Sequence, residues 1–387
     1  MKKRLVSILA AAAVFVTAAC GNTSAQTAET AARETETAVQ TAETAVQTAE
    51  TAVQTAETAV QTTETAAQTA ESAAQQEEKK PGGPGNHGGQ GGPGGQGNQR
   101  GGGGRPDKSE DTELQDMIEE VAPKFELLTY EDAESGTSLQ YQLFVPEDYD
   151  ASQTYPLLQF IPDSSVVGKD AADVLTQGWG GLIFASPEEQ AKHPSFVVVP
   201  VFTETVVNDN FEHSEQIETA VRLIQSLTEQ YSIDTDRIYT TGQSMGGMTS
   251  FYLNTAYPDL FAASLFVGSQ WDNSILSVLE DKDFFYIVAA GDPKASEGQA
   301  GLKAVFDEDQ AAYSSAEWSA KDPRETQNAA VEAMLAEGNN ANFVTFTLGS
   351  TTADGSTGNS MAGEHMTSFD YAYKIEAVRD WLYSQSK

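Results

Sequence analysis

Cysteine and basic residues are scarce in this 387-residue chain. Cys20 is the only cysteine, so no disulfide can form within the chain. Lys and Arg number 22 against 57 Asp and Glu, which gives a net charge of -35 at pH 7. A field of that sign repels phosphate backbones and anionic membrane surfaces. The composition therefore argues against nucleic acid as a partner and favours a soluble exported protein that its charge keeps from aggregating.

The apolar run near the N-terminus is too short to span a membrane as a mature helix. It occupies residues 5–16, follows a basic start and precedes a small-residue end, which is typical of a secretory signal. Cys20 follows directly, and this arrangement resembles a bacterial lipoprotein signal. We therefore predict a signal peptide at residues 1–19, a lipidated Cys20 as the only membrane contact, and a cell-surface lipoprotein. The alternative is an ordinary signal peptide and a freely secreted protein.

Two low-complexity segments come next. Residues 20–78 form a stalk in which the unit Thr-Ala-Val-Gln-Thr-Ala-Glu repeats with coiled-coil spacing, beginning at Thr37. Val and Ala bury little area, so a weakly helical or disordered stalk is favoured over a true coiled coil. Residues 79–109 form a Gly- and Pro-rich linker, predicted to be a flexible tether. His87 in this linker has no neighbouring ligand residues, and we predict no metal and no cofactor.

Residues 110–387 alternate apolar runs with longer helical stretches, which predicts an α/β domain with a mostly parallel sheet covered by helices on both faces. Helical stretches are predicted at 215–231, 247–257, 326–337 and 373–384. Candidate buried strands are 155–161, 196–201, 238–241, 263–267, 284–290 and 343–348, with a half-exposed strand at 139–145.

The sequence Gly242-Gln243-Ser244-Met245-Gly246 lies between the strand that ends at Thr241 and the helix that follows. This is the G-x-S-x-G pattern in the strand–turn–helix context that a nucleophile elbow requires. Such a turn crowds the backbone, so the residues two before and two after the serine must be small. It also aims a helix N-terminus at the hydroxyl, where negative charge develops. We therefore predict Ser244 as a nucleophile.

A serine hydroxyl needs a neutral imidazole to take its proton. His365 follows the last strand and precedes the final predicted helix, as the order Ser, acid, His requires. His193 and His213 come earlier and are interpreted as structural or substrate-side residues.

The acid is expected in a loop that follows a strand, between the serine and the histidine. Asp292 follows the strand at 284–290 and is the first candidate. Asp272 is the second, and Glu364 is the third because it would point away from His365 in an extended loop.

The domain resembles bacterial α/β-hydrolases that include predicted secreted peptidases, poly(3-hydroxybutyrate) depolymerase-like proteins and feruloyl or acetyl xylan esterases. The resemblance covers most of residues 125–387 and is carried by the segments 185–188, 236–247 and 257–262. It implies an α/β-hydrolase fold, with Ser244 as nucleophile, Asp292 as acid and His365 as base.

One position departs from that family, where a His-Gly dipeptide usually follows the strand at 155–161 and supplies an oxyanion-binding amide. This chain has Pro162-Asp163-Ser164 instead. Proline has no N–H, and a carboxylate is unfavourable beside an oxyanion unless it points away. We predict that the amide of Ser164 or Asp163 acts together with that of Met245.

Three functions remain open. The leading hypothesis is a serine esterase that acts on acylated carbohydrate or on a polyester, a small ester being the simplest substrate. The second is a serine peptidase, and the third is a surface binding protein on a decayed hydrolase fold. Trp179 and Trp271 are candidates for lining a sugar or aryl site.

Overall fold

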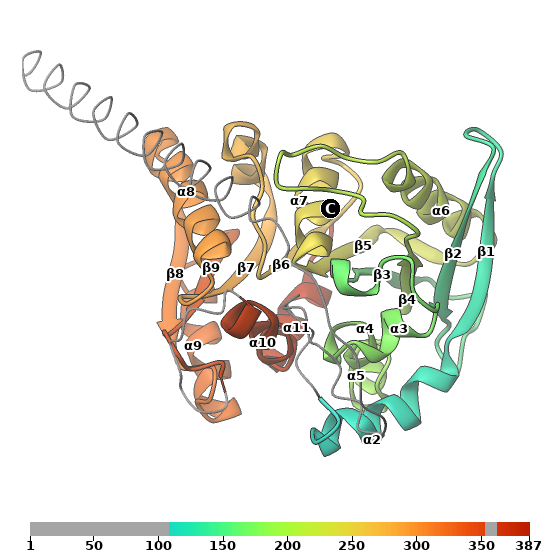
Figure 1. Ribbon diagram of the computed structural model, residues 1–387, viewed down its shortest axis with the longest axis horizontal. Helices are drawn as coiled ribbons and strands as arrows, with labels where there is room; N and C mark the ends of the chain where they lie inside the picture. Colours follow the sequence, from blue (N-terminus) through green and yellow to red (C-terminus); the bar gives the residue numbers. More distant parts are fainter. Residues whose placement is uncertain (1–107, 353–361) are drawn as a thin grey trace, which may run out of the picture. The chain divides into compact units, whose positions relative to one another are not determined.

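The computed structural model describes residues 108–352 and 362–387 (Figure 1). The predicted signal peptide, Cys20, the repeat stalk, His87 and linker residues 79–107 lie outside the described residues. Among the residues described, no helix is both long and apolar enough to cross a membrane.

A nine-stranded mixed sheet forms the centre of the described region, in the order β1-β2-β4-β3-β5-β6-β7-β9-β8. Strand β2 pairs antiparallel with β1 and β4, and all other neighbours pair in parallel. The strands are β1 (Glu126–Asp132), β2 (Thr137–Phe144), β3 (Tyr155–Ile161), β4 (Phe196–Val201), β5 (Ile233–Gln243), β6 (Ala263–Val267), β7 (Asp283–Ala289), β8 (Tyr313–Trp318) and β9 (Ala341–Phe346).

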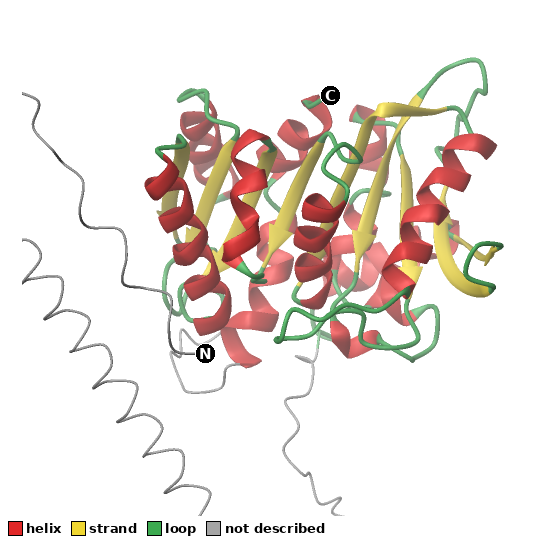
Figure 2. Cartoon of the chain, turned by 90° about the horizontal axis from the view of Figure 1, so that it is seen from above, coloured by secondary structure: helices red, strands yellow, loops and turns green. Residues whose placement is uncertain are grey.

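Helices cover both faces of the sheet (Figure 2). One face carries α6 (Gln216–Gln230), α7 (Met245–Ala256), α8 (Pro293–Asp309) and the 3-10 helix η3 (Asn273–Asp281). The other face is packed by the remaining helices, which are α2 (Thr112–Val121), α3 (Asp173–Thr176), α4 (Trp179–Ile183), α5 (Pro187–Lys192), α9 (Arg324–Leu335), α10 (Ala362–Tyr373) and α11 (Glu376–Ser384). Two short 3-10 helices complete the set, η1 (Ala122–Lys124) and η2 (Ser164–Val166).

Strand β4 shows why these apolar runs become buried strands. Val197 and Val199 belong to the core on the face that carries α3, whereas Phe196 and Val198 belong to the core on the face that carries α6. Alternate side chains are therefore buried on opposite faces, which only a strand covered on both sides achieves. The predicted mostly parallel sheet with helices on both faces is confirmed.

Some predicted elements differ from the structure. The helix predicted at 373–384 corresponds to α11. A second helix, α10, precedes it and was not expected, so His365 lies in a helix and the loop expected there is wrong. Met366, Phe369 and Tyr373 already have helical spacing, but the polar residues between them obscured it. Helix α8 was not predicted because its internal glycines and weak apolar periodicity give little helical signal.

Candidate active site

The carboxyl end of β5 positions Ser244. The chain turns sharply between Gln243, the last residue of β5, and Met245, the first residue of α7. Ser244 takes φ 52° and ψ -119°, a conformation that is costly for a residue with a side chain. Its N–H donates to the carbonyl of Val267 on the neighbouring strand at 3.0 Å, which holds the turn against the sheet.

The two glycines of the motif are required by backbone contacts. A Cβ atom at Gly242 would lie 2.3 Å from the carbonyl carbon of Gly246. A Cβ atom at Gly246 would lie 1.9 Å from the carbonyl oxygen of Ile161 in β3. Any larger residue at either position would force β5, α7 and β3 apart, because backbone atoms cannot move aside as side chains can.

The structure brings Ser244, His365 and Asp292 together. The Nε2 atom of His365 lies 2.9 Å from the hydroxyl oxygen of Ser244, and its Nδ1 atom lies 2.5 Å from Oδ2 of Asp292. Asp292 is buried, and its other carboxylate oxygen accepts the Ala295 N–H at 3.3 Å as the N-cap of α8. The Phe369 ring packs edge-on against the imidazole with a centroid separation of 5.0 Å. This geometry can pass the serine proton to an oriented imidazole.

The other acid candidates have different partners. Asp272 caps η3, where its carboxylate accepts from the N–H and the hydroxyl of Ser274. Glu364 is buried and accepts the N–H of Gly349 at 2.8 Å and the N–H of Gly291 at 3.3 Å. The helical direction of α10 thus turns Glu364 away from the imidazole that follows it in sequence.

The other two histidines of the described region belong to separate clusters. His193 pairs with Asp380 at 2.9 Å and stacks on Tyr383. His213 stacks on Tyr252, with 4.3 Å between the ring centroids.

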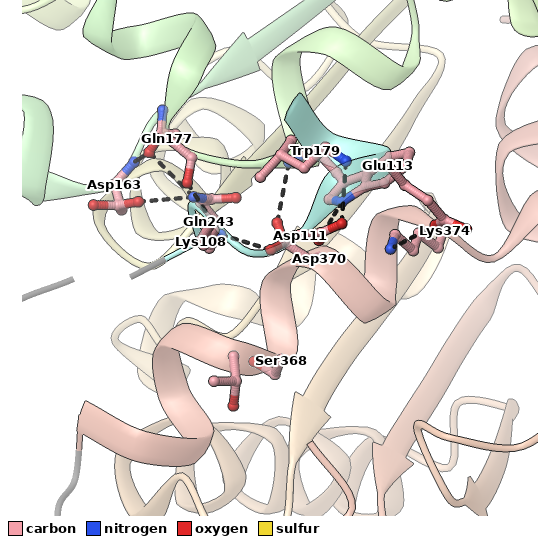
Figure 3. A network of polar contacts seen from close by, with 12 residues as sticks. Lys108, Asp111, Glu113, Asp163, Gln177, Trp179, Gln243, Ser368, Asp370 and Lys374 are labelled. Carbon is pink, nitrogen blue, oxygen red and sulfur yellow. Dashed lines mark hydrogen bonds and ion pairs between the residues drawn. The ribbon is translucent and has the colours of Figure 1, made fainter. Parts of the chain in front are cut away.

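A carboxylate at position 163 would be unfavourable if it faced the oxyanion. The Asp163 carboxylate is instead buried and accepts hydrogen bonds from two donors. Its oxygens accept the Ser165 N–H at 2.8 Å and the Gln243 side-chain amide at 2.7 Å (Figure 3). The Asp163 N–H donates to the Gln177 side-chain oxygen at 3.4 Å. With that amide engaged, the amide of Ser164 is the remaining candidate donor from this segment. Ser164 and Met245 both line the cavity that contains Ser244.

The same polar network extends to the first residue described. Figure 3 shows Lys108 beside Asp370, and its ammonium lies 2.6 Å from that carboxylate and 3.0 Å from the carbonyl oxygen of Gln177. Asp370 also accepts the Trp179 N–H at 3.0 Å. Lys108 falls within the predicted linker, but it contacts α10 and Gln177, whose side chain binds the Asp163 amide next to Ser164.

The buried side chain of Tyr286 connects two segments that line the cavity. Burial, and secondly the negative charge of Asp292, raise the pKa of Tyr286 well above its ordinary value. The neutral Tyr286 hydroxyl contacts the carbonyl of Ser269 and lies 3.1 Å from the carbonyl of Ala295. It therefore ties the loop after β6 to the first turn of α8, which Asp292 caps.

The cavity that contains Ser244 has a volume of about 380 Å³. One wall of the cavity is formed by the segment between β4 and α6, which includes Thr205, Asn208 and Asp209. The sequence patterns did not identify this segment. The available signal was length, because a long connection without regular structure often has a functional role.

The two candidate tryptophans lie in different places. Trp179 is buried at the start of α4, where Lys374 lies over its ring. Trp179 is not among the described residues that line the cavity at Ser244. Trp271 is also buried, but it lines a second cleft beside that cavity.

Glu364 holds two glycine amides next to the site, and its replacement is expected to slow turnover. The Glu364→Gln side chain keeps one carbonyl oxygen but turns an NH₂ group toward the other N–H, which leaves a buried donor unpaired. We expect kcat for a small ester to fall by about 10-fold, because Gly291 precedes Asp292 and a displacement of about 1 Å can cost more than that. KM should stay nearly constant, since Glu364 does not line the cavity. Steady-state kinetics beside the exposed control Glu113→Gln checks this, and an unchanged kcat would contradict it.

Scans of protein-family models and of curated proteins find no match. Among solved structures, the chain is similar to a thermostable esterase, with 23% identity, a TM-score of 0.55, and coverage of 69% of this chain and 64% of that chain. It is also similar to a ferulic acid esterase from the fungus Anaeromyces mucronatus, at 12% identity, coverage of 66% and 91%, and a TM-score of 0.42. A feruloyl esterase module from Clostridium thermocellum matches at 13% identity, coverage of 68% and 90%, and a TM-score of 0.41. The likeness to the thermostable esterase confirms the predicted α/β-hydrolase fold.

Proposed function

We propose that this protein is a serine hydrolase that cleaves carboxylic esters through an acyl-enzyme on Ser244. The hydrogen-bonded series from Ser244 through His365 to the buried Asp292 carries this proposal. The three residues line a cavity that can hold a small acyl group and part of its alcohol.

The geometry supports an ordinary two-step reaction. The Ser244 oxygen attacks the ester carbonyl carbon while Nε2 of His365 takes the hydroxyl proton. The carbonyl oxygen gains negative charge and is stabilised by the amides of Met245 and Ser164. When the carbon–oxygen ester bond breaks, the imidazolium returns the proton to the leaving alcohol. Water then attacks the acyl-enzyme by the same route and releases the carboxylic acid, and no cofactor takes part.

An acylated carbohydrate or a polyester is the proposed substrate, and an extracellular substrate suits an exported enzyme. Peptide cleavage would use the same groups and expel an amine. Turnover of 4-nitrophenyl acetate, feruloyl esters, acetylated xylan, 3-hydroxybutyrate oligomers and peptides separates these reactions. Rapid labelling of Ser244 by a fluorophosphonate would exclude the binding-protein alternative, whereas failure to label together with saturable glycan binding would support it.

We also propose that the protein is anchored at the cell surface through a lipid on Cys20. The basic, apolar and small-residue sequence before Cys20 supports this. Mass spectrometry of the native N-terminus is expected to find a diacylglyceryl-modified Cys20 as the first residue. An unmodified Cys20, or a free amine at another residue, would show a freely secreted enzyme instead.

Deletion of residues 21–107 is expected to leave turnover of a soluble ester nearly unchanged. The stalk and the linker have only Val and Ala as apolar side chains, and these are too small to build a wall of the site. The deletion must keep Lys108 because of its contacts with Asp370 and Gln177. Steady-state kinetics of the purified truncation checks this, with a deletion of 21–108 as the matched comparison. A large loss of turnover in the folded 21–107 deletion would make the stalk part of the catalytic unit.

A further inference from the structure

A second cleft adjoins the catalytic cavity, and it also has a volume of about 380 Å³. Asp209, Gln270 and Lys294 line both spaces. The Lys294 ammonium lies 2.5 Å from one Asp209 oxygen, and the Gln270 side-chain amide lies 3.4 Å from the other. A ligand whose ester lies at Ser244 can therefore extend across these three polar side chains into the second cleft.

Phe211 presents an aromatic ring to this cleft. Only Phe211 is aromatic among the exposed large hydrophobic side chains of the described residues, which are Leu127, Phe211, Ile275 and Leu348. Its φ of 62° lies in the left-handed region, which is unfavourable for a bulky residue. The exposure of the ring and the strain of the backbone both reduce the stability of the folded protein. Strained positions of this kind are concentrated at functional sites.

The turn that carries Phe211 is held by its neighbours. The Asn208 side-chain oxygen accepts the N–H groups of Asn210 and Glu212 at 2.9 and 3.2 Å, and the Phe211 N–H donates to the Asn208 carbonyl at 3.0 Å. The buried Trp271 packs edge-to-face against the Phe211 ring at 5.3 Å. The ring is therefore a positioned surface for a ligand.

We propose that this cleft binds neutral sugar units of a polysaccharide whose acylated unit lies at Ser244, an inference that rests on the proposed function. A pyranose ring has an apolar C–H face that packs on an aromatic ring and hydroxyls that both donate and accept hydrogen bonds. The carboxylates of Asp209 and Glu297 only accept, and the ammonium of Lys294 only donates. Sugar hydroxyls can satisfy both kinds of group.

The lining also discriminates between ligand classes. The carbonyl and ester oxygens of a polyester only accept hydrogen bonds, so a polyester in the cleft would displace water from the Glu297 carboxylate without offering it a donor. An acidic sugar would face three carboxylates, those of Asp209, Asp272 and Glu297, against the single cation Lys294. Neutral sugar units avoid both penalties.

Calorimetric titration of the mature protein with unacylated xylohexaose tests the cleft independently of catalysis. We expect saturable binding that Phe211→Ala weakens by about 2- to 10-fold, the usual effect of losing one aromatic contact. Phe211→Gly should weaken binding equally while relieving the backbone, because glycine tolerates positive φ. The exposed control Leu127→Ala on β1 should bind as the unmodified protein does.

Steady-state kinetics with a large and a small ester distinguish sugar binding in the cleft from the reaction at Ser244. Phe211→Gly should raise KM for an acetylated xylo-oligosaccharide by the same factor. It should leave 4-nitrophenyl acetate turnover unchanged, since Phe211 lines the second cleft and not the cavity at Ser244. No saturable binding of xylohexaose, or binding that survives both Phe211 variants, would overturn the cleft proposal. Sugar binding that depends on Phe211 in a protein that cleaves neither ester would support the cleft and overturn the proposed function.

Discussion

Ser244→Ala and His365→Ala are each expected to lower turnover of a soluble ester by up to about a million-fold, because the two side chains act as one unit. The hydroxyl oxygen and the imidazole Nε2 are 2.9 Å apart, so the proton can pass directly between them. Without the serine there is no acyl-enzyme, and without the imidazole the hydroxyl keeps its proton. The residual rate comes from the oxyanion amides and from binding.

The double variant decides whether the two residues share one mechanism. We expect it to be scarcely slower than either single variant, since removing the second partner of a broken pair costs little more. Turnover measured at high protein concentration, beside thermal unfolding of each variant, checks this. His213→Ala is the matched control, because that imidazole stacks on Tyr252. Losses that add up on a logarithmic scale, or full activity of folded Ser244→Ala, would contradict the proposal.

The fold could be predicted well where buried strands are continuous apolar runs. The predicted bounds of β3, β4 and β6 agree with the structure because both faces of these strands are covered. Strand β8 was not predicted because it lies at the edge of the sheet and only two of its side chains are buried. Half-exposed edge strands mix polar and apolar residues, so their pattern is weak.

The site could be predicted only where local sequence determines local geometry. The elbow at Ser244 could be predicted from Gly242 and Gly246, because the close approach of these two glycines within one turn is a short-range requirement. The direction of the Asp163 carboxylate could not be predicted, because it depends on a hydrogen bond from Gln243. Gln243 is distant in sequence and lies at the end of the neighbouring strand β5. Trp271 is the one residue of the cleft beside Phe211 that the sequence suggested for a sugar or aryl site, because the rest of the lining comes from three separate segments whose meeting has no local signal.

Asp292 occupies a position from which it can affect both folding and catalysis, and its two oxygens separate these roles. One oxygen accepts the Ala295 N–H and caps α8, whereas the other faces Nδ1 of His365. An asparagine keeps an oxygen for the cap. Its NH₂ group then faces Nδ1, which favours the tautomer that carries its proton on Nε2. That nitrogen can then no longer accept the proton of Ser244.

Asp292→Asn is therefore expected to lower kcat by about ten-thousand-fold while leaving stability nearly unchanged, because the imidazole stays in place in the wrong tautomer. KM for a small ester should change little. Asp272→Asn is the control: its carboxylate only caps η3, so turnover should remain near that of the unmodified protein. Thermal unfolding distinguishes a lost cap from a lost tautomer, since a lost cap costs about 1 kcal/mol of stability. If the loss of turnover instead appears in Asp272→Asn and Asp292→Asn stays active, the acid belongs to the loop after β6, and the 2.5 Å contact between Asp292 and His365 has no catalytic role.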